Sequence, residues 1–140
     1  MKMAPTGNGR RQDYRHAPLP RMTNLCLAPG DTAPGDLVAD VRDGLYVAGV
    51  GQGVVVPGED RFAFDVLDGF RIEDGRRTAP VAGLRVHGRL SGLLGCITGV
   101  ADDFRLDAAR GHCRKAGQVV PVSVGTPTVL LAGLEVEEQV

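Results

Sequence analysis

The chain has 140 residues and a mass of 14.7 kDa, the size of one domain that buries roughly 70% of the surface its unfolded form exposes. Apolar residues make up 43% and charged residues 24%, which is typical of a soluble globular protein rather than a disordered or fibrous one. A net charge of −1 argues against a nucleic-acid-binding surface, and no apolar run approaches the length of about 18 residues that a membrane span needs.

The cysteines and the N-terminus bear on cellular location. Cys26, Cys96 and Cys113 are far apart, odd in number and without a CxxC pair, so they do not form a disulfide framework. The N-terminus lacks the apolar segment of a signal peptide. We therefore expect a cytoplasmic protein, with Cys26 and Cys96 in its core because their neighbours are apolar.

The N-terminal segment differs in composition from the rest. Its first 21 residues carry five Lys and Arg against one acid, Asp13, and such a segment cannot build a core by itself. It is either a solvated tail, which composition alone favours, or an arm that orders against another part. We assign residues 1–24 to this basic arm and residues 25–140 to one β domain. His16, within the arm, has no evident role.

One segment after the arm predicts a helix. Asp31 and Thr32 offer N-cap oxygens, Pro34 suits the first turn, and Gly44 ends the pattern. The apolar face of this helix contains Leu37, Val38 and Val41. A weaker pattern near residues 90–94 predicts a second helix or a loop.

The remaining segments predict strands, because they are short, rich in Val, Leu and Phe, and separated by turn signals. They cover residues 45–50, 54–56, 61–66, 70–73, 81–87, 119–124 and 129–136. Asp68-Gly69 and Asp74-Gly75 predict hairpin turns, and the glycines of residues 49–53 predict a tight turn or bulge. The predicted fold class is mostly β (α+β): an antiparallel β domain with one or two short helices.

The densest local chemistry surrounds Cys113. His112, Arg114 and Lys115 flank it, and neighbouring cations favour the thiolate, which binds zinc or attacks electrophiles. The alternative is a buried cysteine acting as a small apolar residue. No GxSxG, P-loop or HExxH motif is present, and no two histidines are spaced to face one metal from a helix.

Several blocks of the chain resemble a known family along nearly its whole length. They are GNGRRQDYRHAPLPRMTN at 7–24, DGLYV at 43–47, GQG at 51–53, RIEDGRRTAPVAG at 71–83 and HCRKAGQVVPVSVGTPT at 112–128. In order and content they resemble the C-terminal domain of the TldD/PmbA proteins, the zinc metallopeptidases formerly called modulators of DNA gyrase. The blocks are long enough that chance is a poor explanation.

The resemblance implies a zinc site shared between domains. In the family, an HExxxH helix preceding this domain supplies two histidines and a general base, and a cysteine of the C-terminal domain is the third protein ligand. Cys113 matches that cysteine, which places the chain on the metal-binding TldD side. The resemblance further implies a cytoplasmic hetero- or homodimer that cleaves unfolded peptides.

Five polar residues of the matched blocks are further candidates for substrate binding or for bracing the zinc ligand: Asn8, Arg10, Arg21, Asn24 and Gln118. Their structural alternatives are simple. Arg21 could pair with a carboxylate, and Asn24 could cap a turn. Gly117 and Gly125 are predicted to lie in turns.

One departure from the family is decisive for activity: the sequence contains no HExxxH motif. Alone, the chain is expected to hold zinc weakly and to hydrolyse nothing, so an HExxxH-bearing chain in trans would have to complete the site. The alternative is a non-catalytic, truncated β domain that acts as a binding or dimerisation module, and a third reading is a fragment of a longer product. Exposed apolar surface is expected to favour a homodimer or a complex.

Overall fold

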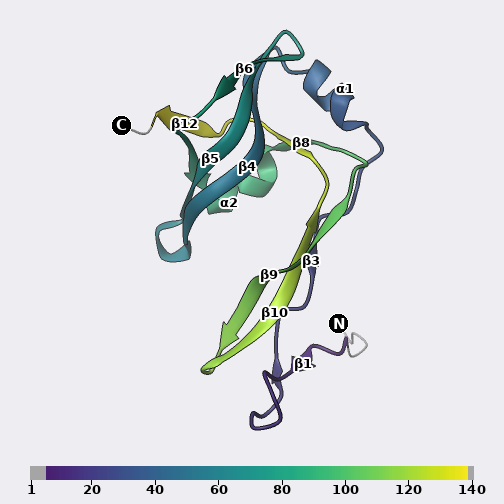
Figure 1. Ribbon diagram of the computed structural model, residues 1–140, viewed down its shortest axis with the longest axis vertical. Coiled ribbons are helices and arrows are strands. Elements are labelled where there is room, and N and C mark those ends of the chain that lie inside the picture. Colours follow the sequence, from purple (N-terminus) through teal and green to yellow (C-terminus); the bar gives the residue numbers. More distant parts are fainter. Residues whose placement is uncertain (1–5, 139–140) are drawn as a thin grey trace. The chain divides into compact units, whose positions relative to one another are not determined.

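The computed structural model describes residues 6–138, with the backbone alone for residues 108–110. Its strands are β1 (Gly9–Arg10), β2 (Leu19–Pro20), β3 (Leu25–Cys26), β4 (Asp43–Val56), β5 (Arg61–Glu73), β6 (Arg76–Val81), β7 (Leu84–Arg89), β8 (Ile97–Val100), β9 (Arg105–Lys115), β10 (Gln118–Thr126), β11 (Val129–Leu131) and β12 (Glu135–Glu138). Its helices are α1 (Pro34–Ala39), α2 (Leu90–Leu93) and two 3-10 turns, η1 (Pro57–Glu59) and η2 (Leu94–Cys96). The mostly antiparallel β fold with short helices confirms the predicted fold class (Figure 1).

The chain forms two compact units. Unit 1 comprises residues 1–29 and 104–127, and unit 2 comprises residues 30–103 and 128–140. The two units therefore alternate along the sequence, each built from two separate segments. The division at residue 24 between an arm and a β domain stays a prediction.

Unit 1 is built around the hairpin of β9 and β10. The strands pair antiparallel from Gln118 opposite Lys115 to Thr126 opposite Arg105, with a bulge between Val122 and Val124. Strand β3 adds parallel to β10, and β1 pairs with β2 within the arm. The described part of the N-terminal arm, residues 6–24, is thus ordered beside the hairpin rather than a solvated tail.

The hairpin turn of unit 1 consists of Ala116 and Gly117, whose φ angles are 48° and 73°. Two consecutive positive φ values define a type I′ turn, whose twist matches that of the paired strands. This confirms the prediction of a turn at Gly117. Gly125 instead lies inside β10 without a positive φ, so the predicted turn there is wrong.

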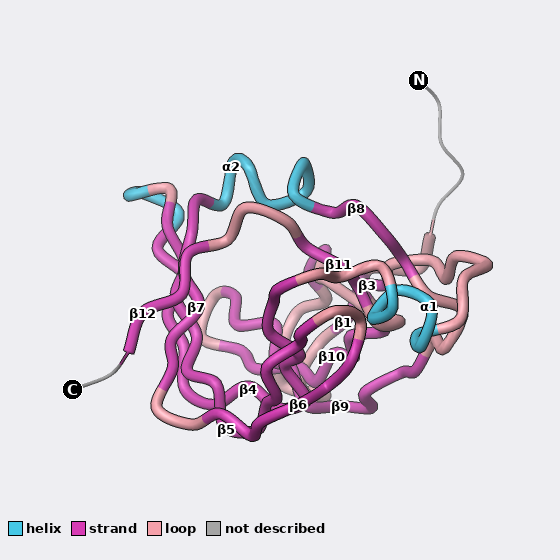
Figure 2. Tube along the Cα trace, turned by 90° about the horizontal axis from the view of Figure 1, so that it is seen from above, coloured by secondary structure: helices cyan, strands magenta, loops and turns pink. Residues whose placement is uncertain are grey.

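Unit 2 contains a five-stranded antiparallel sheet, seen from above in Figure 2. Strand β5 is central: β4 pairs with it along its length, while β7 and β6 pair with its first and second halves. Strand β12 adds to the far side of β7, and β8 pairs with β11 in a separate ladder. The hairpin turn predicted at Asp74-Gly75 is confirmed, with φ angles of 47° and 75°.

Two predictions about β4 and β5 have different outcomes. Asp68 and Gly69 lie inside β5, so a hairpin turn there is wrong. The sequence Asp-Gly permits a turn, but here it pairs with β4, where Asp68 lies opposite Gly49. The glycine-rich residues 49–53 continue β4 through three register shifts, which confirms the bulge reading.

Helix α1 confirms the predicted helix but is shorter. Pro34 occupies its first turn and Leu37 is buried, as expected. The N-cap residue is Ala33, which forms no side-chain cap, so the predicted capping by Asp31 or Thr32 is wrong. The helix ends at Ala39, before Gly44. Helix α2 confirms the weaker pattern at residues 90–94.

The core is small. Its buried apolar residues are Leu37, Phe62, Val66, Ile72 and Ala101 in unit 2 and Val120 and Val122 in unit 1. Many large apolar side chains stay exposed, including Leu94 at 79% and Leu67 at 70%. None of the described helices is long and apolar enough to cross a membrane.

Candidate functional site: the cysteine strand of unit 1

Cys113 lies near the end of β9, opposite Val120 of β10. Successive side chains of a strand point to opposite faces, so His112 and Arg114 face away from the side of the sheet that holds Cys113. Val120 is 4% exposed, whereas Cys113 is half-buried. Cys113 therefore sits at the margin of the small core of unit 1, partly open to solvent.

Arg21 holds the strand that carries this thiol. Its side chain is 5% exposed, and its Nη1 donates to the carbonyl oxygen of Cys113 at 3.1 Å and lies 3.9 Å from Cys113 Sγ. Its Nη2 donates to the carbonyl oxygen of Lys115 at 3.2 Å, and its Nε to that of Arg10 at 3.2 Å. One planar guanidinium thus joins the arm to two carbonyls of β9, that of the cysteine itself and that of Lys115. Arg21 bonds carbonyls here, and the predicted pairing with a carboxylate is not what the structure has.

Two further cations fasten the arm to the hairpin. Lys115 Nζ donates to the carbonyl oxygen of Pro20 at 3.1 Å. Arg10 donates to the carbonyl oxygens of Met22 at 3.1 Å and Pro121 at 2.8 Å. Every one of these acceptors is a backbone oxygen, so Arg10 and Arg21 of the arm, and Lys115 of β9, bond carbonyl groups rather than acids.

Gln118 is the second buried polar side chain of unit 1, with 4% exposure. Its Oε1 accepts from the backbone N–H of Gln12 at 3.2 Å, and its Nε2 donates to the carbonyl oxygen of Ala17 at 3.2 Å. Gln12 returns the contact, because its Oε1 accepts from the N–H of Val119 at 2.7 Å. The turn between Gln12 and Ala17 is therefore held at both ends.

Within that turn, Asp13 and His16 form a pair that the sequence analysis did not single out. His16 Nδ1 and Asp13 Oδ1 are 2.7 Å apart, and the same Oδ1 accepts from the N–H of Arg15 at 2.9 Å. The hydrogen bond from His16, followed by that from Arg15, lowers the pKa of Asp13 below its ordinary value. The sequence does hold a signal for this pair, because Asp13 and His16 are three residues apart in a segment with no other acid.

The remaining two candidates, Asn8 and Asn24, lie apart from β9, the strand that carries Cys113. Asn8 and Asn24 are exposed, and the contact of Asn8 to this region is through its carbonyl oxygen, which accepts from the N–H of Arg21 at 2.9 Å. Of the five polar candidates, the structure brings Arg21 to Cys113 directly, while Arg10 and Gln118 bind the arm to the same hairpin.

The other two cysteines are not core residues. Cys26 is exposed at the end of β3, and Cys96 is partly exposed in η2, so their predicted burial is wrong. Apolar sequence neighbours did not bury them because β3 is a two-residue edge strand and η2 is a single turn with no buried residue.

Whether this region can hold zinc depends on how many ligand side chains are grouped around Cys113. A half-buried sulfur at the edge of a sheet is the soft ligand that zinc favours. Within residues 6–138, leaving out the side chains of 108–110, no three His, Cys, Asp or Glu residues are grouped to hold a metal ion. The described part of the chain therefore offers zinc one suitable ligand, Cys113, rather than a complete ligand set.

Comparison with known proteins assigns the fold and the residues to a family. The model of the PmbA/TldA metallopeptidase C-terminal domain matches residues 1–138. The chain belongs to this family. The chain is 40% identical over 129 residues to a metalloprotease TldD homolog of Haemophilus influenzae, with 92% of this chain and 27% of that protein covered. It is 33% identical over 132 residues to a zinc metalloprotease TldD homolog of Saccharolobus solfataricus, covering 94% and 29%.

Solved structures share the fold of this PmbA/TldA-type domain. A modulator of DNA gyrase from Thermotoga maritima superposes with a TM-score of 0.64 at 22% identity, covering 81% of this chain and 24% of that one. TldE from Thermococcus kodakarensis gives a TM-score of 0.60 at 21% identity, covering 91% and 27%. The chain spans only about a quarter of the length of these proteins and of its curated relatives. It is thus a metallopeptidase C-terminal domain by family.

Proposed function

We propose that this chain is the cysteine-bearing half of a TldD-type zinc metallopeptidase that cleaves unfolded peptides. Cys113 would supply one zinc ligand, and an HExxxH-bearing chain would supply two histidines and the general base. Bound in this way, zinc would polarise a water molecule and the peptide carbonyl for hydrolysis. This chain's own residues would hold the ligand and help to orient the peptide.

The observation that carries the proposal is the support of Cys113 by Arg21. A cysteine that only filled space would not need a buried guanidinium bonded to its own carbonyl and to that of Lys115. The positive charge 3.9 Å from Sγ also suits a sulfur that binds metal as thiolate. Residues that fix a ligand are the usual second layer of a metal site.

The family comparison supports the proposal from a different side. One relative, from Saccharolobus solfataricus, is named a zinc metalloprotease. The chain covers about a quarter of such relatives and contains no HExxxH motif, so histidines from outside residues 1–140 must complete the site if the chain takes part in catalysis. A homodimer of this chain alone would not supply the missing histidines. We expect the complex to work in the cytoplasm.

Reconstitution tests this role. The chain is mixed with an HExxxH-bearing TldD-type chain, and both bound zinc and hydrolysis of an unfolded peptide are measured. We expect Cys113→Ala to lower zinc affinity and the rate by at least about 100-fold. The matched control is Cys26→Ala, which removes the exposed thiol of the same unit. Equal zinc content and activity in wild type and Cys113→Ala would show that the ligand role is wrong.

A second candidate function is a non-catalytic module that binds or dimerises with full-length relatives. The exposure of large apolar side chains favours it, notably Leu67 at 70% and Leu94 at 79%. Light scattering distinguishes this function from the catalytic one, because a module of this kind self-associates or binds a relative regardless of Cys113. A monomer that binds no relative at micromolar concentration would exclude this second candidate.

A further inference from the structure

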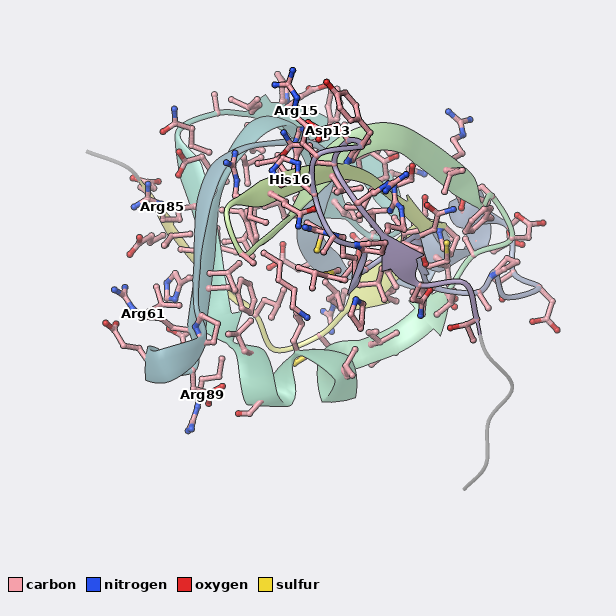
Figure 3. The ribbon with its side chains drawn as sticks, turned by 90° about the horizontal axis from the view of Figure 1, so that it is seen from below. Asp13, Arg15, His16, Arg61, Arg85 and Arg89 are labelled. Atoms are coloured by element: carbon pink, nitrogen blue, oxygen red, sulfur yellow. The ribbon has the colours of Figure 1, made fainter. Side chains whose placement is uncertain are left out.

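In and beside the turn from Gln12 to Ala17, basic side chains outnumber the acids that could pair with them. Arg11, Arg15 and His16 lie within or beside it, and Asp13 is the one acid of the arm. Asp13 is already engaged by His16 and by the N–H of Arg15. Figure 3 shows the labelled side chains of Asp13, Arg15 and His16 close together. Protonation of His16 would add to the surplus.

This turn is rigid enough to present its side chains in a fixed arrangement. The buried amide of Gln118 bonds the backbone at both of its ends, and Gln12 bonds back to β10. Inside the turn, the N–H of His16 donates to the carbonyl oxygen of Asp13 at 3.3 Å. A flexible basic tail would lose conformational entropy on binding a ligand, and this turn has already lost it on folding.

The donors are oriented for an acceptor outside the turn. The ionised Asp13 carboxylate only accepts, so His16 Nδ1 carries the proton of their bond, and Nε2 can donate to a carboxylate only when the ring holds a second proton there. Arg15 donates through Nε to the Tyr14 hydroxyl at 2.9 Å, and its Cζ lies 5.2 Å from the Tyr14 ring centroid. This bond uses Nε and leaves the Nη edge of the guanidinium, which matches a carboxylate in a two-pronged contact.

The turn also lies on the same end of the hairpin as the proposed zinc ligand. Gln118, which holds the turn, is opposite Lys115, two residues along β9 from Cys113. Two residues of strand span about 7 Å, so the residue that holds the turn lies at the end of the hairpin that carries Cys113.

We propose that Arg11, Arg15 and His16 form a carboxylate-binding site that anchors a peptide. That the peptide is the substrate rests on the proposed function, whereas the binding itself needs neither zinc nor a partner chain. The carboxylate has two sources: the C-terminus of the peptide or an Asp or Glu side chain. Both offer the same pair of oxygens to the guanidinium and imidazole.

Three short peptides of one sequence test the proposal, each with a fluorescent label at its N-terminus. The first has a free C-terminal carboxylate and no acidic side chain, the second is amidated, and the third is amidated with one internal Glu. Their affinities for the full chain are measured by fluorescence anisotropy in metal-free buffer. We expect the first to bind about fivefold more tightly than the second, because it adds a charged hydrogen-bonded contact at a partly exposed site.

Variants locate the binding. Arg15→Gln and His16→Gln are expected each to remove most of the advantage of the free carboxylate, since both side chains are on the surface of the turn and their loss leaves Gln118 in place. The control is Arg76→Gln, an exposed arginine in the β5–β6 hairpin of unit 2, which should keep the advantage. Tight binding of the third peptide would assign the source to a side chain, and weak binding would assign it to the C-terminus.

Two results would overturn the proposal: equal binding of the free and amidated peptides, including no binding of either, or an advantage that survives in Arg15→Gln and His16→Gln as it does in Arg76→Gln. Neither depends on Cys113. Failure of the zinc role would appear in the reconstitution assay of Cys113→Ala, so the two proposals fail in different measurements.

Discussion

Arg21 and Cys113 are 92 positions apart in the sequence, yet the guanidinium of the first bonds the carbonyl oxygen of the second at 3.1 Å and lies 3.9 Å from its sulfur. The contact is nearly sealed from solvent on the arginine side. Buried arginines need a partner for each N–H group, and here the backbone of β9 and the arm supplies them. The position of the thiol therefore depends on a residue of the arm.

Replacing Arg21 should destabilise unit 1. Arg21→Ala leaves three carbonyl oxygens without their donor and opens a cavity, at an expected cost of about 3 kcal/mol in the free energy of unfolding. Arg21→Lys should lose less, because an ammonium can satisfy one or two of the oxygens but lacks the planar fork. Chemical denaturation measures both.

The matched control for this loss is Arg114→Ala. Arg114 is exposed on the opposite face of β9, and its replacement should change stability by less than about 0.5 kcal/mol. Equal stabilities of Arg21→Ala and Arg114→Ala would contradict the role of Arg21 as the joint between arm and hairpin.

Replacing Gln118 should loosen the turn from Gln12 to Ala17 without unfolding the hairpin. In Gln118→Leu the N–H of Gln12 loses its acceptor, and hydrogen exchange at that amide should accelerate at least about tenfold. The N–H of Leu27, bonded to the carbonyl oxygen of Gly125, serves as an internal reference whose rate should hold. Unchanged exchange at Gln12 would show that Gln118 does not hold the turn.

Asp60 gives a test of pH dependence in unit 2. The Ser91 hydroxyl, the Ser91 N–H and then Arg89 lower the pKa of the Asp60 carboxyl below 3.8. A carboxyl with a lowered folded pKa adds stability that is complete above pH 3.8 and is lost as the pH falls through the folded pKa. Ser91→Ala should therefore raise this pKa toward its ordinary value and shrink that contribution.

Carboxyl chemical shifts followed through an NMR titration measure the change at Asp60. Ser91→Thr keeps a hydroxyl and is the conservative control, so its Asp60 should titrate close to wild type. A pKa of Asp60 that stays the same in Ser91→Ala would show that the hydroxyl bond does not cause the shift.

Gly125 tests the packing of unit 1. A Cβ at this position would lie 2.5 Å from Phe104 Cζ and 3.0 Å from Cys26 Sγ, so Gly125→Ala forces the ring to move and should cost about 1–3 kcal/mol. Gly9→Ala is the control in the same unit, because its Cβ meets nothing within 4 Å. Thermal melts of the two variants should differ by several degrees, and equal melting would rule out the close approach.

The elements that could be predicted from the sequence are those with strong local signals. Pro34 and Leu37 marked α1, and Asp74-Gly75 marked a turn, because these features act within a few residues. Strand β9 was missed, since RLDAARGHCRK is charged and poor in β-branched residues. It is a strand because β10 pairs with it along most of its length, which no local pattern reveals.

The candidate site divides in the same way. Cys113 stood out through its flanking cations and its match to the family, and Arg21 through the block at residues 7–24. What Arg21 does could not be predicted, because its acceptors are carbonyl oxygens, which every residue has, at positions far along the chain. The pairing of Asp13 with His16 depends on a turn whose shape Gln118 determines from more than 100 positions away.

The alternation of the two units along the chain sets an order of events during synthesis. Arg21 is translated before residues 30–103, but the carbonyls of Cys113 and Lys115 that it binds are made only after all of them. Contacts of such long range form late, because a long loop must close before they add any stability. Until β9 is made, Arg21 lacks these two acceptors, so the strand that carries Cys113 gains the support of Arg21 only after residues 30–115 have been translated.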